Sequence, residues 1–233
     1  VCSSDLPVGE DYTQEHLEMV ALFADAVALG YTRFLDLQAA EERAQQQAIE
    51  AASERLRAAA LSMQSTDDLP MVTAVLRQQL ETFGFSGFST VTFLDRESGT
   101  CIGLSALENP SKRGLTMSST GAVEIDDEMI VTFYEYHAED DRSPEPRVRS
   151  MWKSGEVEQA TNGPGSKKRK IRRQLLTHLG ISEADADRAG YYPSSGRSYS
   201  TRVPFSSGMV GFHGPDPDDH LLPLYQELTE ALD

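Results

Sequence analysis

The sequence predicts an α+β protein in which a long helix precedes a domain with a central antiparallel sheet and flanking helices. Two observations predict this fold class. Residues 31–64 contain no glycine or proline and are rich in strong helix formers. Further along the chain, short β-rich segments of alternating polarity are separated by turn residues, with helical segments before and after them.

The helical pattern starts well before residue 31. Thr13 is a suitable N-cap, and the residues after it follow the i, i+3, i+4 spacing of an amphipathic helix packed on a neighbour. The residues that set this spacing are Leu17, Val20, Phe23, Ala24, Val27 and Tyr31. Gly30 costs about 1 kcal/mol relative to alanine, which does not have to end a helix. A continuous helix from Thr13 to Gln64 would be roughly 75 Å long; the alternative is two shorter helices in a bundle.

Within this helix, a heptad repeat predicts a coiled coil. Its a and d positions form a seam of five residues, namely Ile49, Ala52, Leu56, Ala59 and Met63. The two alanines allow close approach of a second helix. Extended backward by sevens, the seam meets Glu42 and then Leu35, so Glu42 interrupts it. We therefore expect a parallel homodimer whose seam is weak enough to switch between two packings.

The domain after the long helix is predicted from periodicity and turn residues. Residues 65–68 (STDD) form a turn and helix cap, and Gly84 ends the helix that follows. The expected helices cover residues 69–83, 144–154, 171–179, 181–189 and 218–232. The expected strands cover residues 88–94, 101–107, 122–125, 129–136, 198–204 and 209–212, with turns at 95–99 and 206–208. Residues 161–170 are expected to form a loop.

The composition is that of a soluble globular protein. The chain has 233 residues, of which 39% are hydrophobic and 25% charged, and a formal net charge of −16. Such a field repels nucleic acid and anionic membranes, and no apolar run is long enough to span a bilayer. No signal peptide is recognisable, and Cys2 and Cys101 are too few for a disulfide framework. We therefore expect a cytoplasmic protein.

The first six residues differ in kind from the rest. Val1–Leu6 (VCSSDL) is what the nucleotides GTG TGC TCT TCC GAT CT encode, and this string resembles a common sequencing adapter. We expect residues 1–6 to be an artefact and the chain to be a fragment of a longer protein, assembled from environmental reads. The other interpretation is a natural N-terminus.

The end of the chain resembles its beginning at a constant offset of 205 residues, as between Leu17 and Leu222. At this offset Leu222, Leu224, Tyr225, Leu228 and Leu232 match Leu17, Met19, Val20, Phe23 and Val27. We therefore expect the chain to start in the last helix of one domain and to stop in the last helix of the next, as in an array of modules in series.

Two segments of the long helix region also carry a family resemblance. Tyr31–Gln38 (YTRFLDLQ) and Glu54–Leu69 (ERLRAAALSMQSTDDL) are similar to the inter-domain linkers of bacterial multidomain sensor histidine kinases with GAF-type domains. The rest resembles a GAF-like domain more loosely, through a Phe-Gly pair after the first helix, a strand hairpin, the segment Met151–Glu156 (MWKSGE) and a closing strand before an acidic helix start.

This resemblance implies a GAF-like fold, with helices on one face of the sheet and a pocket on the other. It divides the chain into four parts: residues 1–6, the terminal helix of a preceding GAF-like domain at 7–33, a coiled-coil linker at 34–66 and a GAF-like sensor domain at 67–233. The chain lacks the phospho-acceptor His setting and the ATP-binding glycine motifs of the kinase core. It also lacks the cyclic-nucleotide pattern of some GAF domains, and Cys101 is expected to be a buried thiol rather than a bilin attachment site.

Candidate catalytic and metal-binding patterns are weak. None of the five histidines belongs to a zinc motif, and the cluster at residues 213–220 (HGPDPDDH) is more simply explained by helix capping. Residues 163–168 lack the phosphate-loop pattern, and Ser194, Ser195 and Ser198 lack a nucleophile elbow. We name no catalytic residue, no metal ligand and no cofactor.

Two further groups have two interpretations each. The basic run formed by Lys167–Lys170 with Arg172 and Arg173 is an anion or partner dock or, more simply, a solvated surface. Tyr134, Tyr136 and Trp152 line a small-molecule pocket or belong to the core.

The sequence as a whole predicts a non-enzymatic sensory and relay segment of a bacterial signal-transduction protein of the histidine-kinase type. Its domain would bind an unknown small molecule or only transmit strain. The first alternative is a ligand-free dimerisation or scaffold module. The second is a divergent enzyme, such as a hydrolase that uses residues 216–220.

Overall fold

The computed structural model describes residues 13–85, 87–94, 100–118, 122–136, 154–162, 173, 175–189, 198–215 and 219–233. Its contacts divide the chain into two compact units, Val1–Ala48 and Ile49–Asp233. Helix α1, Gln14–Leu61, contains residues 14–48 of the first unit and opens the second.

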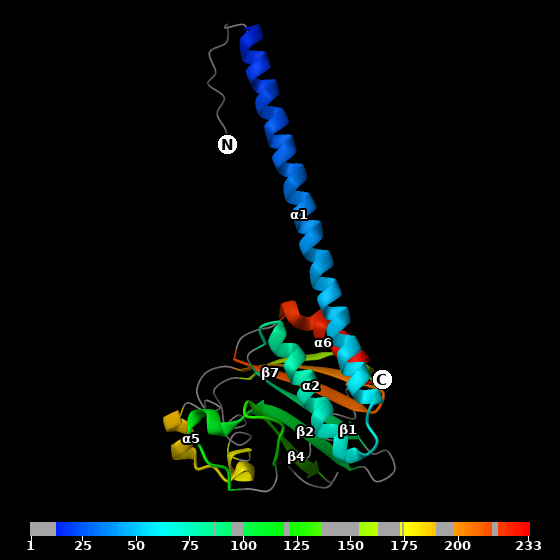
Figure 1. The fold of residues 1–233 in the computed structure, drawn as a ribbon, viewed down its shortest axis with the longest axis vertical. Coiled ribbons are helices and arrows are strands. Elements are labelled where there is room, and N and C mark those ends of the chain that lie inside the picture. Colours follow the sequence, from blue (N-terminus) through cyan, green and yellow to red (C-terminus); the bar gives the residue numbers. More distant parts are fainter. Residues whose placement is uncertain are drawn as a thin grey trace. The chain divides into compact units, whose positions relative to one another are not determined.

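Helix α1 is one uninterrupted α-helix (Figure 1), as predicted. At its start the backbone N–H of His16 donates a hydrogen bond of 3.3 Å to Oγ1 of Thr13, which confirms the N-cap. Gly30 lies inside the helix with nothing within 4 Å of where a Cβ would be. The alternative of two shorter helices is therefore wrong. The helix ends at Leu61, three residues before the predicted end.

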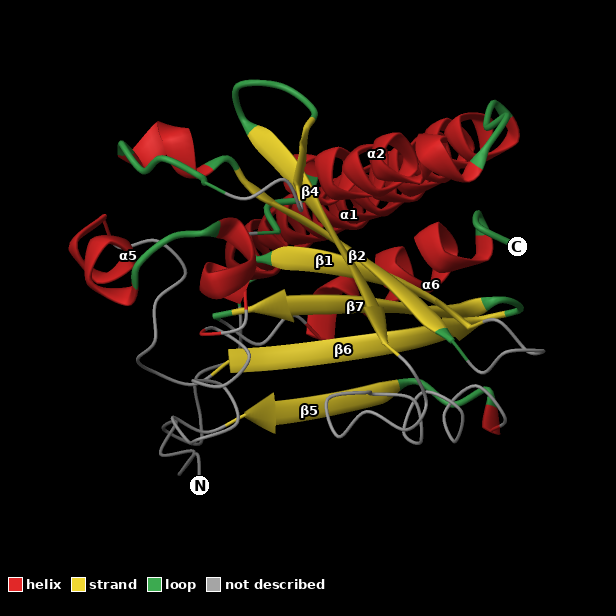
Figure 2. Ribbon diagram, turned by 90° about the horizontal axis from the view of Figure 1, so that it is seen from below, coloured by secondary structure: helices red, strands yellow, loops and turns green. Residues whose placement is uncertain are grey.

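The second unit is built on one sheet of seven antiparallel strands in the order β3-β4-β2-β1-β7-β6-β5 (Figure 2). The strands are β1 (Phe88–Leu94), β2 (Cys101–Glu108), β3 (Ala122–Glu124), β4 (Met129–Tyr136), β5 (Glu158–Asn162), β6 (Ser198–Phe205) and β7 (Gly208–Gly214). Six of the seven were predicted to within two residues, and β3 lies at an edge of the sheet as expected.

The helices of the second unit whose bounds are described lie where they were predicted, although α6 is shorter than the helix predicted over residues 218–232. They are α2 (Leu69–Thr82), α5 (Glu183–Ala189) and α6 (Leu222–Glu230), with short 3-10 helices η1 (Thr66–Asp68), η2 (Pro110–Arg113) and η3 (Asp219–Leu221). Ser65 and Asp68 form a capping box before α2, and Gly84 follows it with φ +80°. Ser182 caps α5, because its Oγ accepts a hydrogen bond of 3.1 Å from the N–H of Asp185.

The two faces of the sheet are covered by different helices. Residues 49–60 of α1 pack with α2 and α6 on one face. The most enclosed large side chains of this core are Leu56, Leu76, Leu80, Val210, Phe212, Leu224, Tyr225 and Leu228. On the other face, Leu107 and Ile130 pack against residues 175–181 and α5. The α+β class is therefore confirmed, with helices flanking an antiparallel sheet.

One strand was not predicted. Residues 158–162 (EQATN) form β5, although 161 and 162 were assigned to a loop. β5 lies at the edge of the sheet and pairs with a single neighbour. It contains only one small apolar residue, so it shows no alternating apolar pattern that would predict a strand. The predictions for residues 1–6, 95–99, 144–153, 163–172 and 190–197 lie outside the described residues.

Candidate functional site

The expected coiled-coil seam lies largely inside the domain. Leu56 is fully enclosed, Ala52 is 1% exposed and Ile49 is 7% exposed, all three in the core that contains α2 and α6. Ala59 is partly buried against the same core, whereas Met63 is 37% exposed. Polar contacts add to this packing. Ser53 Oγ donates a hydrogen bond of 3.4 Å to the carbonyl oxygen of Glu227.

This burial corrects the role that the sequence pattern suggested. The core of the same chain buries the side chains of Ile49, Ala52 and Leu56. A seam between two chains therefore needs other residues. The physical reason is that a and d spacing marks one apolar face of a helix without naming its partner. The same spacing serves a second helix of another chain or the core of the helix's own domain.

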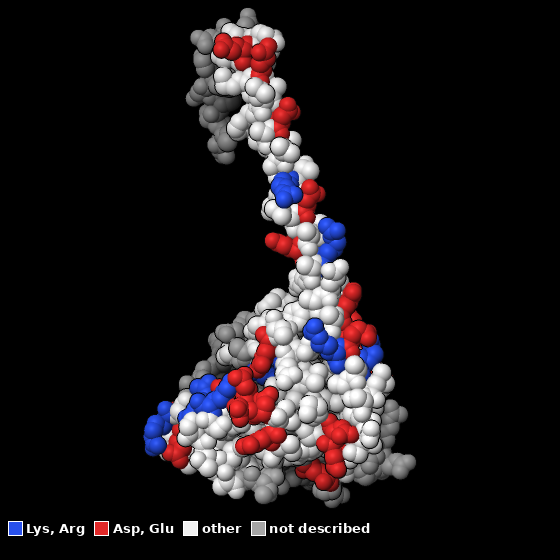
Figure 3. All heavy atoms as spheres, viewed as in Figure 1, with Lys and Arg blue, Asp and Glu red and all other residues white. Residues whose placement is uncertain are grey.

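The part of α1 before Ile49 shows the opposite behaviour. Every described side chain from residue 13 to residue 48 is exposed. The large apolar ones are between 44% and 74% exposed and are Leu17, Met19, Val20, Leu22, Phe23, Val27, Leu29, Tyr31, Phe34, Leu35 and Leu37. Charged groups stand at intervals along this stretch, with uncharged surface between them (Figure 3). So much exposed apolar surface on one helix marks an interaction site.

These exposed residues form two faces. The heptad register of Ile49 and Ala52, continued backward, meets polar residues at 38, 42 and 45 and then an unbroken apolar seam of Leu17, Ala21, Ala24, Ala28, Tyr31 and Leu35. We call these six residues the upstream seam. A second face, centred on Met19, Val20 and Phe23, lies next to it around the helix. The remaining side is mixed: it carries the polar residues Glu18, Asp25 and Asp36 together with the exposed Leu22 and Leu29.

A second candidate site is a row of polar residues across the sheet. The pairing registers place Thr132, Ser105, Thr90, Gly211, Arg202 and Glu158 side by side on six neighbouring strands. Because side chains alternate along a strand, this row points away from the face that carries Val91 and Val210. Arg202 Nη1 lies 2.9 Å from Glu158 Oε2, in a half-buried ion pair.

His213 lies beside this polar row. Its ring stacks on Phe88, with centroids 4.6 Å apart and planes 13° from parallel, and its Nε2 lies 3.4 Å from Thr90 Oγ1. Burial and, to a smaller extent, the positive charge of Arg202 lower the pKa of His213 from 6.5 to about 3, so the imidazole is neutral at pH 7. A Cβ on Gly211 would lie 2.5 Å from Thr90 Oγ1 and 2.8 Å from His213 Nε2, so the glycine makes room for this contact.

Sequence reasoning did not find the polar row. The signal was weak, since Thr90, Ser105 and Thr132 lie on three different strands and β1 also contains Ser89 and Thr92. Only the register of the strands brings the three hydroxyl groups together, and register is not readable from one strand alone.

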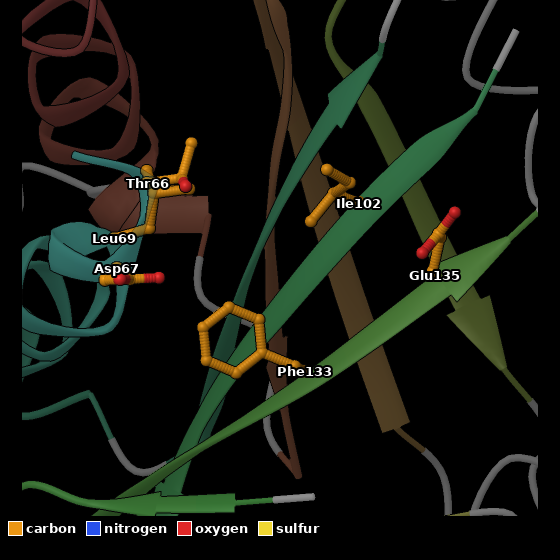
Figure 4. A pocket seen from close by; sticks show the side chains of 6 residues that line it. All are labelled: Thr66, Asp67, Leu69, Ile102, Phe133 and Glu135. Carbon is orange, nitrogen blue, oxygen red and sulfur yellow. The ribbon is translucent and has the colours of Figure 1, made fainter. Parts of the chain in front are cut away.

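A hollow with a mostly apolar lining lies on the face of the sheet that packs against α2 (Figure 4). It is open, has a volume of about 360 Å³, and is lined by Thr66, Asp67 and Leu69 next to the start of α2 and by Ile102, Phe133 and Glu135 on β2 and β4. Figure 4 shows the ring of Phe133 and the side chain of Leu69 facing the same space. Among the described residues, Asp67 and Glu135 of this hollow form no recognisable catalytic arrangement.

The remaining sequence candidates are placed as follows. Cys101 is a buried thiol on β2, as expected. In the 213–220 cluster, His213 ends a strand and Asp219 Oδ1 accepts a hydrogen bond of 3.0 Å from Gln159, whereas residues 216–218 lie outside the described part. Arg173 pairs with Glu183 at 2.7 Å. The side chains of Tyr134, Tyr136 and Trp152 are not among those described.

Two searches of the described residues were negative. No group of three or more His, Cys, Asp or Glu side chains in them is arranged to hold a metal ion. None of the helices formed by these residues combines the length and the apolar character needed to cross a membrane. Comparison with protein-family models, with curated proteins and with solved structures found no match to this chain. The GAF-like character of the domain therefore stays a prediction.

Proposed function

We propose that this chain is a cytoplasmic sensory and relay segment of a bacterial signal-transduction protein of the histidine-kinase type, active as a parallel homodimer. The continuity of α1 carries the proposal. One helix contributes Ile49, Ala52 and Leu56 to the core of an α+β domain and, without a break, presents an uncovered apolar face upstream. A change in the packing of the domain core would therefore move the upstream residues of the same helix.

The upstream seam is the dimer contact in this proposal. All six of its residues are alanine, leucine or tyrosine at consecutive a and d positions, and all six are exposed in the single chain. Small residues at Ala21, Ala24 and Ala28 allow two helices to approach closely while they contribute little burial each. Such a seam is weak enough to have two packings within a few kcal/mol of each other, as a relay requires.

Disulfide cross-linking tests the dimer. In a Cys2→Ser background, Ala24→Cys places one thiol on the upstream seam and Asp25→Cys places one on the mixed side, about 100° around the helix. A parallel pair brings the two copies of a d position close enough for a disulfide, which needs Cα atoms about 4.4–6.8 Å apart. We expect a cross-linked dimer with Ala24→Cys and little with Asp25→Cys. Equal yields from the two variants, or a monomer by light scattering, would refute the dimer.

The polar row is the proposed sensing site of the domain, and its half-buried members Thr90, Arg202 and Glu158 are the accessible ones, because Ser105 and Thr132 are buried. It combines three hydroxyl groups, the neutral imidazole of His213 and the Arg202–Glu158 ion pair, which suits a small polar molecule. A thermal-shift screen tests this role, because a ligand of the folded state raises the melting temperature by mass action. A stabilising compound should lose its effect in the Thr90→Val variant. If no compound stabilises the protein while the dimer persists, a ligand-free scaffold is the better description.

A further inference from the structure

The second copy of the internal repeat forms α6, and most of its apolar side chains are buried. In α6 and the residues beside it, Leu224 is 2% exposed, Tyr225 and Leu228 are fully enclosed, and Ala231 is 4% exposed. These four side chains hold α6 on β6 and β7, where Tyr225 stacks on Phe212. At the offset of 205 residues their counterparts in α1 are Met19, Val20, Phe23 and Ala26.

The first copy carries the same pattern but lacks the partner. Met19 and Val20 are each 61% exposed and Phe23 is 72% exposed. The positions between them agree as well, since the exposed Glu230 and Gln226 correspond to the exposed Asp25 and Ala21. In α1 this apolar face is therefore exposed, whereas the equivalent face of α6 packs on the sheet.

We propose that Met19, Val20, Phe23 and Ala26 dock on the sheet of a second α+β domain built like residues 49–233, in the position that α6 occupies in this one. This proposal rests on the proposed function, because it identifies the second of the two modules that the relay helix would connect. The sheet of a second copy of this chain is not the occupant. Its equivalent position is already filled by its own Leu224, Tyr225 and Leu228.

The docking face and the upstream seam lie on adjacent sides of one helix and meet at Ala24, whose counterpart Thr229 is 1% exposed in the second copy. Met19 and Phe23 lie roughly 90–160° around the helix from Leu17 and Ala24, at about 100° per residue. One side of the helix is thus free to meet a sheet while the adjacent side meets its symmetry mate. A helix that is apolar on two adjacent faces is what this arrangement needs, and a helix with only one partner would have polar residues at Met19 and Phe23.

A pair of chimeras tests the fit. In the first, residues 221–232 of the full chain are replaced by residues 16–27, which puts Met19, Val20, Phe23 and Ala26 into the four core positions. In the second, the same residues are replaced by residues 17–28. This control has almost the same composition and helix propensity, but its apolar face is rotated by about 100°.

We expect the first chimera to unfold in one cooperative transition within about 15 °C of the parent protein and at least about 10 °C above the second. Equal stability of the two chimeras, whether both fold or both fail to fold, would overturn the proposal. So would loss of self-association in the intact chain on Phe23→Asp, because the face would then belong to a second copy. Cross-linking through Ala24→Cys tests the dimer separately, so failure of the docking proposal and failure of the proposed function are distinguishable.

Discussion

The ring of Tyr225 on α6 stacks on the ring of Phe212 on β7, with centroids 3.8 Å apart and planes 5° from parallel. The ring of Phe85 packs edge-on against Tyr225, with centroids 6.0 Å apart. Leu56 and Ala52 of α1 belong to the same cluster. The final helix, the sheet and residues 49–60 of α1 therefore share one core. Because this core is close-packed, a change of side-chain volume in any of the three alters the packing of the other two.

Truncation of Leu56 tests whether residues 49–60 of α1 are core or interface. Leu56→Ala should lower the free energy of unfolding by about 2–5 kcal/mol in urea titrations, because it leaves a cavity in an enclosed core. Leu61→Ala is the control, since Leu61 is 81% exposed and its truncation should stay within about 0.5 kcal/mol. If Leu56→Ala weakened association and left the stability of the domain unchanged, Leu56 would be an interface residue as the heptad first suggested.

The capping box before α2 is expected to contribute to the stability of the domain. Ser65 Oγ accepts a hydrogen bond of 3.2 Å from the N–H of Asp67, and Asp68 Oδ2 accepts bonds from the N–H groups of Gln64 and Ser65 at 2.8 and 3.0 Å. Ser65→Ala removes one of these partners and should cost about 1 kcal/mol in a thermal or urea melt. Ser62→Ala is the matched control, because its hydroxyl only bonds back to Ala59 in the helix that ends there. Equal effects of the two changes would show that the cap contributes nothing.

The elements that the sequence predicted well are those with local signals. Thr13, Ser65, Ser182 and Gly84 mark helix ends through their own side chains or backbone, so one stretch of sequence suffices. What could not be predicted depends on distant partners. Leu56 has the same spacing whether it meets a second chain or Tyr225, and Glu158 has no signal of its own until Arg202 is beside it. Periodicity identifies the face of an element, and only the tertiary structure identifies what covers it.

Gly211 tests the arrangement around the polar row. A methyl group there would lie within 2.8 Å of both Thr90 Oγ1 and His213 Nε2, so Gly211→Ala should displace the imidazole and destabilise the domain by about 1–3 kcal/mol. Gly30→Ala is the control, because nothing lies within 4 Å of the new methyl group. In the interior of α1 it should instead add about 1 kcal/mol of helix stability. Changes of the same sign in circular-dichroism melts of both variants would contradict the described environment of Gly211.

The neutral His213 predicts a pH dependence of stability. Its pKa of about 3 in the folded protein lies below the 6.5 of an unfolded chain, so between these values the unfolded state binds a proton that the folded state does not. The contribution of His213 is therefore complete above pH 6.5 and is lost as the pH falls toward 3. The slope approaches about 1.4 kcal/mol per pH unit inside this window.

Urea titrations at pH 7.0, 6.0, 5.0 and 4.5 on the parent protein and on His213→Gln measure the contribution of His213 to the free energy of unfolding. The glutamine keeps a polar atom near Thr90 Oγ1 but does not titrate, so the two stability curves should converge as the pH falls. Carboxylates titrate in the same range in both proteins and cancel in the difference. Parallel curves across the window would mean that His213 is protonated as readily in the folded protein as in the unfolded chain, and that the imidazole is open to water rather than enclosed between Phe88 and the polar row.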